Sequence, residues 1–334
     1  MLELFLQKPY EMDMREAGAL CSPAGDEVKI RVSYGGICGS DLGVYQGKLQ
    51  HAKYPLRPGH ELVGTVIEAG RDAAFQVGTR VVVLPNTYCG ECSYCRSGDT
   101  NICVEKKSLG VNMDGGFSEE FLISSRYVLA IPDDLPDEKA VLIEPFAVVV
   151  HAFKKVRISE DTAVCIVGCG NEGMLAAALA KHLGARVTAI DINPKKLELA
   201  KKVGADIAIL PEDVQKQSFD VVIEAGGTRS SVEHSIQLVR PGGELVVIGL
   251  AQEALLPVAH MVRNELTLYG TIIYNFPSDY LQAIEYLRDP EFRAEAVISM
   301  ITPFTSYQQA FENALSGEYG KIVLKFAGVQ GFFR

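Results

Sequence analysis

Hydrophobic and polar positions divide the chain into two parts with different repeats. Up to about residue 140, short apolar stretches are separated by glycine and proline. Residues Val28, Ile30, Val32 and Tyr34 alternate with charged or small residues, which is typical of a half-buried strand. Further strands are predicted at 62–68, at 77–83, and after Phe117 towards Pro132. This part of the chain is therefore predicted to be an all-β, barrel-like domain.

From residue 163 onward, buried strands alternate with helical patterns. The predicted strands are 163–167, 186–190, 207–210, 220–224, 244–250 and 266–273, and the predicted helices are 174–183, 194–203, 230–238 and 278–287. Six such strands indicate a doubly wound parallel sheet. The capping-box spacing of Ser306 and Gln309 predicts one more helix. The last strand, 322–326, is predicted to return to the first domain, because the six-stranded sheet is already complete.

A glycine-rich turn joins the first two elements of this second part. Gly168, Gly170 and Gly173 form a G-x-G-x-x-G between a strand and a helix, and Asp191 ends the next strand. Such glycines allow the backbone to approach a pyrophosphate at the helix N-terminus, and the acid can accept both ribose hydroxyls of NAD. The strand–turn–helix context favours this interpretation over a glycine-rich turn in another α/β fold.

Charge and composition exclude several classes of partner. The 334-residue chain has a formal net charge of −10 and a pI near 5.2, which argues against a nucleic acid or an anionic membrane surface as partner. No apolar stretch reaches membrane-spanning length. The N-terminal sequence lacks a cationic region followed by a long apolar core, so no signal peptide is expected.

Four of the eight cysteines lie in one short polar loop. Cys89, Cys92, Cys95 and Cys103 have the spacing of a tetrahedral zinc site with no open position, which predicts a structural zinc. The alternative, four reduced and unligated thiols, would be liable to oxidation. Clustered rather than dispersed cysteines favour metal binding in a reducing cytoplasm.

Taken together, these motifs resemble the zinc-dependent medium-chain dehydrogenases over nearly the whole chain. The resembling segments are GGICGSD at 35–41, RPGHELVGTV at 57–66, the cysteine loop, DGGFSEEF at 114–121, IEPFAVVVHA at 143–152, the glycine turn and GEYGKIVL at 317–324. The resemblance implies an α/β architecture with a GroES-like β-barrel catalytic domain, residues 1–147 and 280–334. A Rossmann NAD-binding domain, residues 148–279, is inserted between its two parts.

The resemblance also implies a catalytic zinc. Cys38 and His60 match its first two ligands, Glu61 matches the adjacent acid, and Glu144 matches the remaining ligand position. Either Glu61 or Glu144 could ligate the resting zinc. Glutamate at position 144, where alcohol dehydrogenases carry cysteine, is similar to the sorbitol, glucose and threonine dehydrogenase branches.

Ser40 matches the family residue that takes the proton of the substrate hydroxyl. The histidine that follows it in several relatives is replaced by Gly43, so the relay would run through water, the cofactor ribose or Glu61.

Further cofactor contacts follow from the same resemblance. Besides the glycines and Asp191, the residues expected at NAD are Glu172, Lys196, Ile248, Gly249, Leu250, Thr271, Ile272 and Ile273. Glu172 departs from the family, which often carries an apolar residue there. It would cap the helix or point outward, and if it faced the pyrophosphate it would weaken cofactor binding.

The expected activity is hydride transfer from a secondary alcohol (a polyol, cyclitol or sugar) to NAD in a cytoplasmic homodimer or homotetramer. An L-threonine 3-dehydrogenase-like enzyme is the main alternative. A zinc-free quinone reductase would lack the cysteine loop and the pair Cys38 and His60. A non-catalytic zinc protein that retains the fold is favoured only by Gly43.

Overall fold

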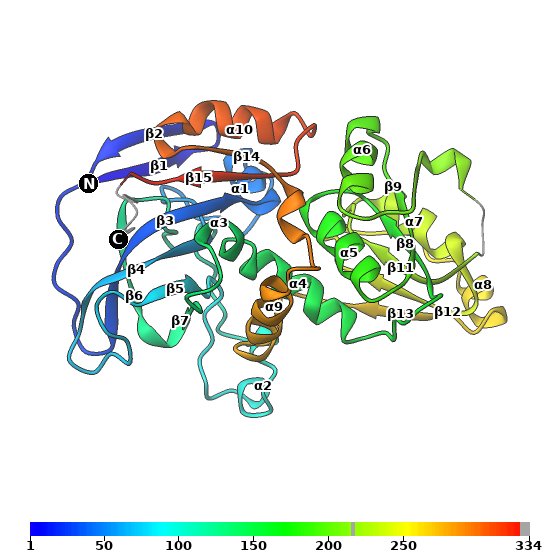
Figure 1. Ribbon diagram of the computed structural model, residues 1–334, viewed down its shortest axis with the longest axis horizontal. Coiled ribbons are helices and arrows are strands. Elements are labelled where there is room, and N and C mark those ends of the chain that lie inside the picture. The colour runs from blue at the N-terminus through cyan, green and yellow to red at the C-terminus, as the bar shows by residue number, and fades with distance from the viewer. Residues whose placement is uncertain (215–217, 328–334) are drawn as a thin grey trace.

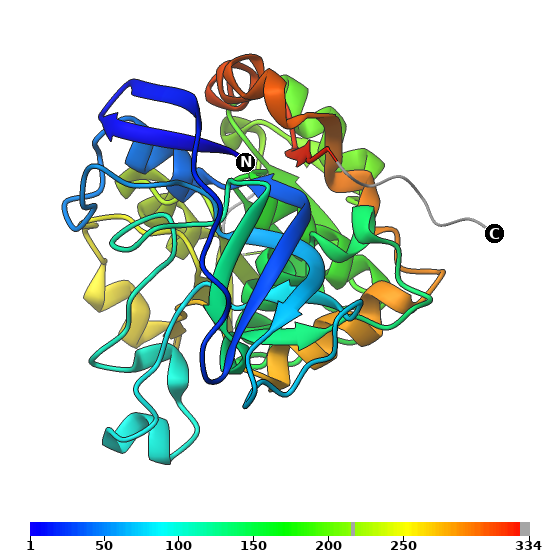
Figure 2. The ribbon, with the colours of Figure 1, turned by 90° about the vertical axis from the view of Figure 1, so that its left-hand side faces the viewer.

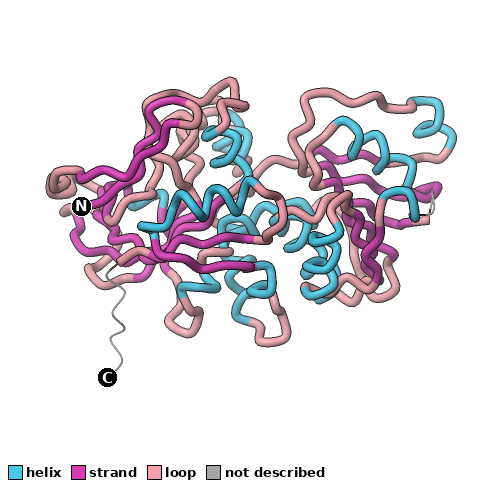
Figure 3. The backbone as a smooth tube through the Cα atoms, turned by 90° about the horizontal axis from the view of Figure 1, so that it is seen from above, coloured by secondary structure: helices cyan, strands magenta, loops and turns pink. Residues whose placement is uncertain are grey.

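The computed structural model describes residues 1–214 and 218–327, and it has two lobes joined by a narrower central region (Figure 1 and Figure 3). The first lobe contains both ends of the described chain. The second lobe is built from the middle of the sequence. The α/β architecture predicted from the sequence is confirmed.

The first lobe is organised around a twisted sheet of seven strands. Its order is β14-β15-β3-β4-β5-β7, and β6 pairs with β3 off this path. The bounds are β3 Glu27–Ile37, β4 Glu61–Ala69, β5 Arg80–Val83, β6 Glu120–Ser124, β7 Val128–Ala130, β14 Ile298–Pro303 and β15 Lys321–Lys325. Because β15 pairs antiparallel with β3, the last strand does return to the first domain, as predicted.

Several elements of this lobe were not predicted. A hairpin of β1 (Leu2–Lys8) and β2 (Glu11–Glu16) lies beside the sheet. The short helices α1 Gly39–Tyr45, α2 Ser93–Arg96 and α3 Asp137–Ala140 were not predicted either. Helix α10, Tyr307–Leu315, is the final helix that the spacing of Ser306 and Gln309 predicted. The loop that carries α2 extends away from the rest of the lobe (Figure 2).

The second lobe is a six-stranded parallel sheet in the order β10-β9-β8-β11-β12-β13, which is the doubly wound arrangement. The strands are β8 Ala163–Val167, β9 Arg186–Ile190, β10 Ile207–Ile209, β11 Phe219–Glu224, β12 Val239–Val247 and β13 Thr267–Gly270. The helices are α5 Asn171–His182, α6 Pro194–Lys202, α7 Arg229–Leu238 and α8 Val258–Arg263. Asn193 caps α6 through its side chain, which accepts from the backbone N–H of Lys195 at 3.0 Å.

Two helices lie between the lobes, α4 Ile143–Phe153 and α9 Ser278–Arg288 (Figure 1). One apolar cluster runs from Val63 and Val82 of the first sheet through Phe146 of α4 to Ala176 and Val221 of the second lobe. The first predicted domain boundary, 147/148, falls inside α4 and the second, 279/280, inside α9. Both boundaries stay predictions.

The structure differs from the sequence prediction at several element ends. Strand β12 begins at Val239 rather than 244, and β13 ends at Gly270 rather than 273. Strand β12 ends at Val247 rather than 250, because the chain turns at Gly249, where a Cβ would lie 2.3 Å from the backbone nitrogen of Gly227. The capping box at Ser306 does not form. A 3₁₀ turn over Phe304–Ser306 leaves Ser306 with φ −95° and ψ 24°, which is not the extended geometry that an N-cap side chain needs.

Candidate active site

Helix α1 begins directly after Cys38 and organises the first group of candidate zinc ligands. The buried Asp41 carboxylate accepts hydrogen bonds from the backbone N–H groups of Cys38 (2.9 Å) and Gly59 (3.2 Å), and it lies 3.1 Å from Nδ1 of His60. A carboxylate acceptor assigns the imidazole proton to Nδ1 and leaves Nε2 to act as a ligand atom. Nε2 lies 3.3 Å from Oγ of Ser40. Asp41 therefore fixes both the start of α1 and the orientation of His60.

The ligand atoms of Cys38, His60 and Glu61 lie within 4.8 Å of one another. Burial raises the pKa of the Cys38 thiol, and Glu61 raises it further. Burial alone lowers the pKa of His60, but Asp41 and Cys38 together raise it well above its usual value. Acidic groups packed round one imidazole form a donor set that a divalent cation would neutralise.

Glu61 is held by a fully buried ammonium group. Nζ of Lys321 lies 2.6 and 2.7 Å from the two carboxylate oxygens of Glu61, and both side chains are 0% exposed. Lys321 also donates to the carbonyl of Ile37 at 3.3 Å. The pair joins the first residue of β4 to the first residue of β15, across β3. Glu61 would have to share or release a bond to Lys321 in order to ligate zinc.

Glu144 lies outside the group of three ligands, and Tyr274 determines how its carboxylate points. The Tyr274 hydroxyl donates to Oε1 of Glu144 at 2.8 Å and accepts from Nδ2 of Asn86 at 3.0 Å. Burial raises the pKa of Glu144 to about 7. Tyr274 was not identified from the sequence, because 130 residues separate it from Glu144 and Tyr274 itself belongs to none of the motifs.

The four cysteines of the predicted zinc loop converge. Their sulfur atoms all lie within 4.8 Å of one another. Backbone N–H groups point at the sulfurs, from Cys92 to Cys89 at 3.3 Å and from Cys95 to Cys92 at 3.5 Å. The Cys95 N–H lowers the pKa of Cys92 to about 6. Burial raises the pKa of Cys95 to about 12, so the N–H groups do not favour the thiolate form at all four positions. The convergence of four sulfurs in one short loop fits a tetrahedral zinc ion.

The glycine turn has the shape that a dinucleotide requires. Gly168 has φ +92°, and a Cβ at Gly173 would lie 1.9 Å from the Gly168 carbonyl oxygen. By contrast, a Cβ at Gly170, the N-cap of α5, would meet no atom within 4 Å. Open space beside free helix N–H groups is what a bound pyrophosphate would fill.

Asp191 lies beside this turn at the end of β9. One carboxylate oxygen accepts from the backbone N–H of Cys169 at 2.7 Å, and the other accepts from the N–H of Asn193 at 2.8 Å. Each oxygen keeps lone pairs for a ribose hydroxyl. Lys196 donates to the carbonyl of Tyr319, and burial lowers the pKa of Lys196 although Asp191 opposes the shift.

The other expected cofactor residues follow the carboxyl ends of β12 and β13, at the same edge of the parallel sheet as the glycine turn. The carbonyl of Glu224 accepts from the N–H groups of Ile248 and Gly249, and Leu250 is 76% exposed. The Thr271 hydroxyl is buried without a hydrogen-bond partner in the described part of the chain. Ile272 accepts from Asn101 through its carbonyl, and Ile273 has φ +41°, which is unusual for a β-branched residue.

Glu172 neither caps its helix nor points away from the protein. The N-cap of α5 is Gly170 and has no side-chain cap, while Oε1 of Glu172 lies 3.9 Å from Sγ of Cys38. The acid of the nucleotide turn therefore contacts a candidate zinc ligand of the other lobe.

Comparison with known proteins gives matches across both lobes. Residues 24–133 match the alcohol dehydrogenase GroES-like domain, and residues 173–289 match the zinc-binding dehydrogenase domain. A sorbitol dehydrogenase of Halalkalibacterium halodurans is 32% identical over 320 residues, covering 91% of this chain and 92% of the relative. The chain belongs to the zinc-dependent medium-chain alcohol dehydrogenases.

Two further relatives match almost the whole length of this dehydrogenase. D-arabinitol dehydrogenase 1 of Uromyces fabae is 32% identical over 346 residues, with 97% of each chain covered. An Escherichia coli CFT073 alcohol dehydrogenase solved with NADH is 27% identical, with a TM-score of 0.90, and the match covers 98% of this chain and 99% of that chain. As a member of this family, the present chain uses zinc and a nicotinamide cofactor. The two groups of candidate ligands that contain cysteine fit zinc, and the open glycine turn fits the nicotinamide cofactor.

The helices of the described chain include none with the length and apolar character to cross a membrane.

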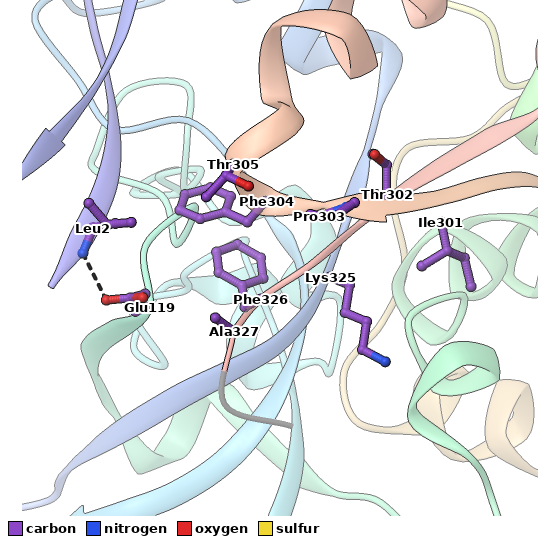
Figure 4. Close-up of a pocket in the computed structure, with 10 residues that line it drawn as sticks. All are labelled: Leu2, Glu119, Ile301, Thr302, Pro303, Phe304, Thr305, Lys325, Phe326 and Ala327. Atoms are coloured by element: carbon purple, nitrogen blue, oxygen red, sulfur yellow. Dashed lines mark hydrogen bonds between the residues drawn. The ribbon is translucent and has the colours of Figure 1, made fainter. Parts of the chain in front are cut away.

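A surface groove of the first lobe lies apart from these groups (Figure 4). It has a volume of about 330 Å³ and is lined mainly by the segments 301–305 and 325–327. Glu119 there accepts from the N–H of Leu2 at 2.8 Å. The groove contains none of the candidate metal ligands.

Proposed function

We propose that this dehydrogenase oxidises a secondary alcohol group of a polyol, cyclitol or sugar, with NAD⁺ as the acceptor. The two curated relatives described above act on sorbitol and arabinitol by name, and Glu144 replaces the cysteine of simple alcohol dehydrogenases. L-Threonine 3-dehydrogenase activity is the weaker alternative.

The observation that carries this proposal is the contact between the two lobes. Cys38 begins α1 in the first lobe and Glu172 lies in the glycine turn of the second, and their side chains are 3.9 Å apart. Hydride transfer requires the reacting groups to be about 3–3.5 Å apart, so metal ligands and nucleotide turn must meet in this way.

In the proposed site, Cys38, His60 and Glu144 hold the catalytic zinc, and Glu61 is the alternative ligand. Bound zinc supplies a Lewis acid that acidifies the alcohol hydroxyl, and bound NAD⁺ supplies the hydride acceptor. Ser40, beside His60, receives the hydroxyl proton. Gly43 stands where several relatives carry the histidine that passes the proton on. A side chain added at Gly43 would contact Leu49, whose Cγ lies 3.2 Å from the position of the added Cβ. Since Lys321 engages both oxygens of Glu61, Glu61 is disfavoured as the group that takes the proton from Ser40.

The experiment is an oxidation screen of polyols, cyclitols, sugars and L-threonine with NAD⁺, followed by the absorbance of reduced nicotinamide and by zinc analysis. We expect turnover with polyols and two zinc ions per chain. Preferential oxidation of threonine would support the amino-alcohol alternative. Two zinc ions without any turnover would favour a non-catalytic protein.

Cofactor choice gives a second test. A 2′-phosphate beside Asp191 would meet a like charge and an acceptor with nothing to donate, so we expect NAD⁺ to be preferred over NADP⁺ by at least about tenfold in kcat/KM. Asp191→Ala should reduce this ratio, mainly by weakening use of NAD⁺. Steady-state kinetics with both cofactors measure it, and Glu198→Ala, an exposed acid of α6, is the control. Equal use of both cofactors by the wild type would show that Asp191 does not face the ribose.

Tyr274→Phe tests how Glu144 is positioned. Without the hydroxyl, the buried Glu144 carboxylate loses its donor, and we expect zinc affinity at the catalytic site to fall by about 10–100-fold. Chelator competition measures the affinity. Tyr307→Phe removes a buried hydroxyl of the first lobe that donates to the carbonyl of Met12 at 3.4 Å and should leave zinc binding unchanged. Equal affinity in Tyr274→Phe and the wild type would argue against Glu144 as a ligand.

We further propose that the enzyme is a homodimer or homotetramer in the reducing cytoplasm. Exposed apolar side chains on and beside α8 support self-association: Leu255 is 68%, Val258 66% and Val262 71% exposed. Light scattering of the purified enzyme would test the oligomeric state.

A further inference from the structure

We propose that Glu172 determines which redox state of the cofactor this enzyme binds more tightly, favouring NAD⁺ over NADH. The inference rests on the proposed function, because it requires the nicotinamide ring to lie beside the zinc ligands during hydride transfer.

The position of Glu172 places a carboxylate close to where the nicotinamide ring must lie. Glu172 is the second residue of α5, between Gly170 and Gly173 of the nucleotide turn, and it is half-buried. Its Oε1 is 3.9 Å from Sγ of Cys38. A ring that takes hydride from a carbon next to the zinc lies within a few ångströms of Cys38. It therefore lies within a few ångströms of Glu172 as well.

The charge of Glu172 is not neutralised by an ion pair among residues 1–214 and 218–327. Two ammonium groups lie within electrostatic range of it, but each has other partners. Lys321 is bound by both oxygens of Glu61, and Lys196 donates to the carbonyl of Tyr319. The half-buried Glu172 carboxylate therefore lies beside Sγ of Cys38 without a cation bound directly to it in the described part of the chain.

Such a charge distinguishes the two cofactors through the ring alone. The nicotinamide of NAD⁺ carries a positive charge and that of NADH carries none, whereas the diphosphate is the same in both. Attraction over a few ångströms in a partly buried site is substantial, and it acts only on NAD⁺. Repulsion between Glu172 and the diphosphate would weaken the binding of both cofactors equally. It would therefore cancel in the ratio of their dissociation constants. The expected consequence is easier release of NADH after each oxidation.

An acid in the first turn of a helix also has a simpler explanation, since it interacts favourably with the helix N-terminus. That explanation predicts a lower melting temperature for a neutral variant and an unchanged cofactor ratio. Measuring binding and stability together therefore separates the two.

The experiment measures Kd for NAD⁺ and for NADH by calorimetry in zinc-loaded wild type, Glu172→Gln, Glu172→Asp and the control Glu198→Gln. We expect Kd(NADH)/Kd(NAD⁺) to fall about tenfold in Glu172→Gln, equivalent to about 1.4 kcal/mol. Glu172→Asp, which keeps the charge, should retain most of the ratio, and the control should retain all of it.

Three results would overturn the proposal: an unchanged ratio with a lower melting temperature, equal changes in both constants, or loss of zinc from Glu172→Gln with an unchanged ratio. Each leaves the proposed function standing. Failure of the wild type to bind either cofactor would instead contradict the proposed function itself.

Discussion

Cys38→Ser and His60→Ala are each expected to abolish alcohol oxidation while leaving NAD⁺ binding nearly unchanged. The thiolate and the imidazole belong to one group of ligand atoms within 4.8 Å, so either change removes one ligand of the catalytic zinc. The alcohol hydroxyl then loses the cation that activates it. We expect kcat/KM to fall by at least about 10³-fold, which is about 4 kcal/mol of transition-state stabilisation.

The cofactor should still bind because its proposed contacts lie on the other lobe, at the glycine turn and Asp191. Calorimetry with NAD⁺ and zinc analysis of each variant separate loss of chemistry from loss of fold. The exposed residues Cys21 and His51 provide matched controls, Cys21→Ser and His51→Ala, which should keep full activity and both zinc ions. Oxidation rates that survive in both ligand variants would exclude the zinc mechanism.

The second lobe was predictable in detail because its information is local in the sequence. Strand β8, the glycine turn, α5 and β9 are consecutive, so hydrophobic periodicity and glycine spacing determine them together. The convergence of Cys89, Cys92, Cys95 and Cys103 is equally local. The structure supports these interpretations to within a few residues at each element end.

The polar contacts that arrange the candidate active site were not predictable in the same way. Lys321 reaches Glu61 only because β15 returns to pair with β3, and Tyr274 reaches Glu144 only because the chain crosses between the lobes. Neither contact has a spacing that could be read from one sequence. Asp41 is different, since Cys38 and Asp41 have the spacing of a capping box. Its role in orienting His60, however, depends on a loop some twenty residues further on.

Cys92→Ser is expected to lower stability far more than it lowers the intrinsic activity of the folded enzyme. The loop 89–103 extends from the first lobe (Figure 2). Within it, Asn101 and Cys103 are the buried residues, so the loop has almost no apolar core to order it. Zinc binding supplies the free energy that a core would otherwise supply.

Loss of this zinc should affect more than the loop. Nδ2 of Asn101 lies 3.4 Å from Nε2 of His151 on α4 and donates to the carbonyl of Ile272 at 3.2 Å, which ties the loop to both segments that connect the lobes. We therefore expect the free energy of unfolding to fall by about 3 kcal/mol or more, and the melting temperature by roughly 5–10 °C.

Calorimetric melting and zinc analysis test this expectation. Ser93→Ala changes an exposed residue of the same loop and should melt like the wild type with two zinc ions per chain. Chelator treatment that removes the loop zinc should bring the wild type down to the melting temperature of Cys92→Ser, because both then lack the same ion. A Cys92→Ser variant with two zinc ions and the wild-type melting temperature would show that the four sulfurs do not hold a structural metal. The order of the loop would then have to come from its N–H···S hydrogen bonds, such as those from Cys92 to Cys89 and from Cys95 to Cys92.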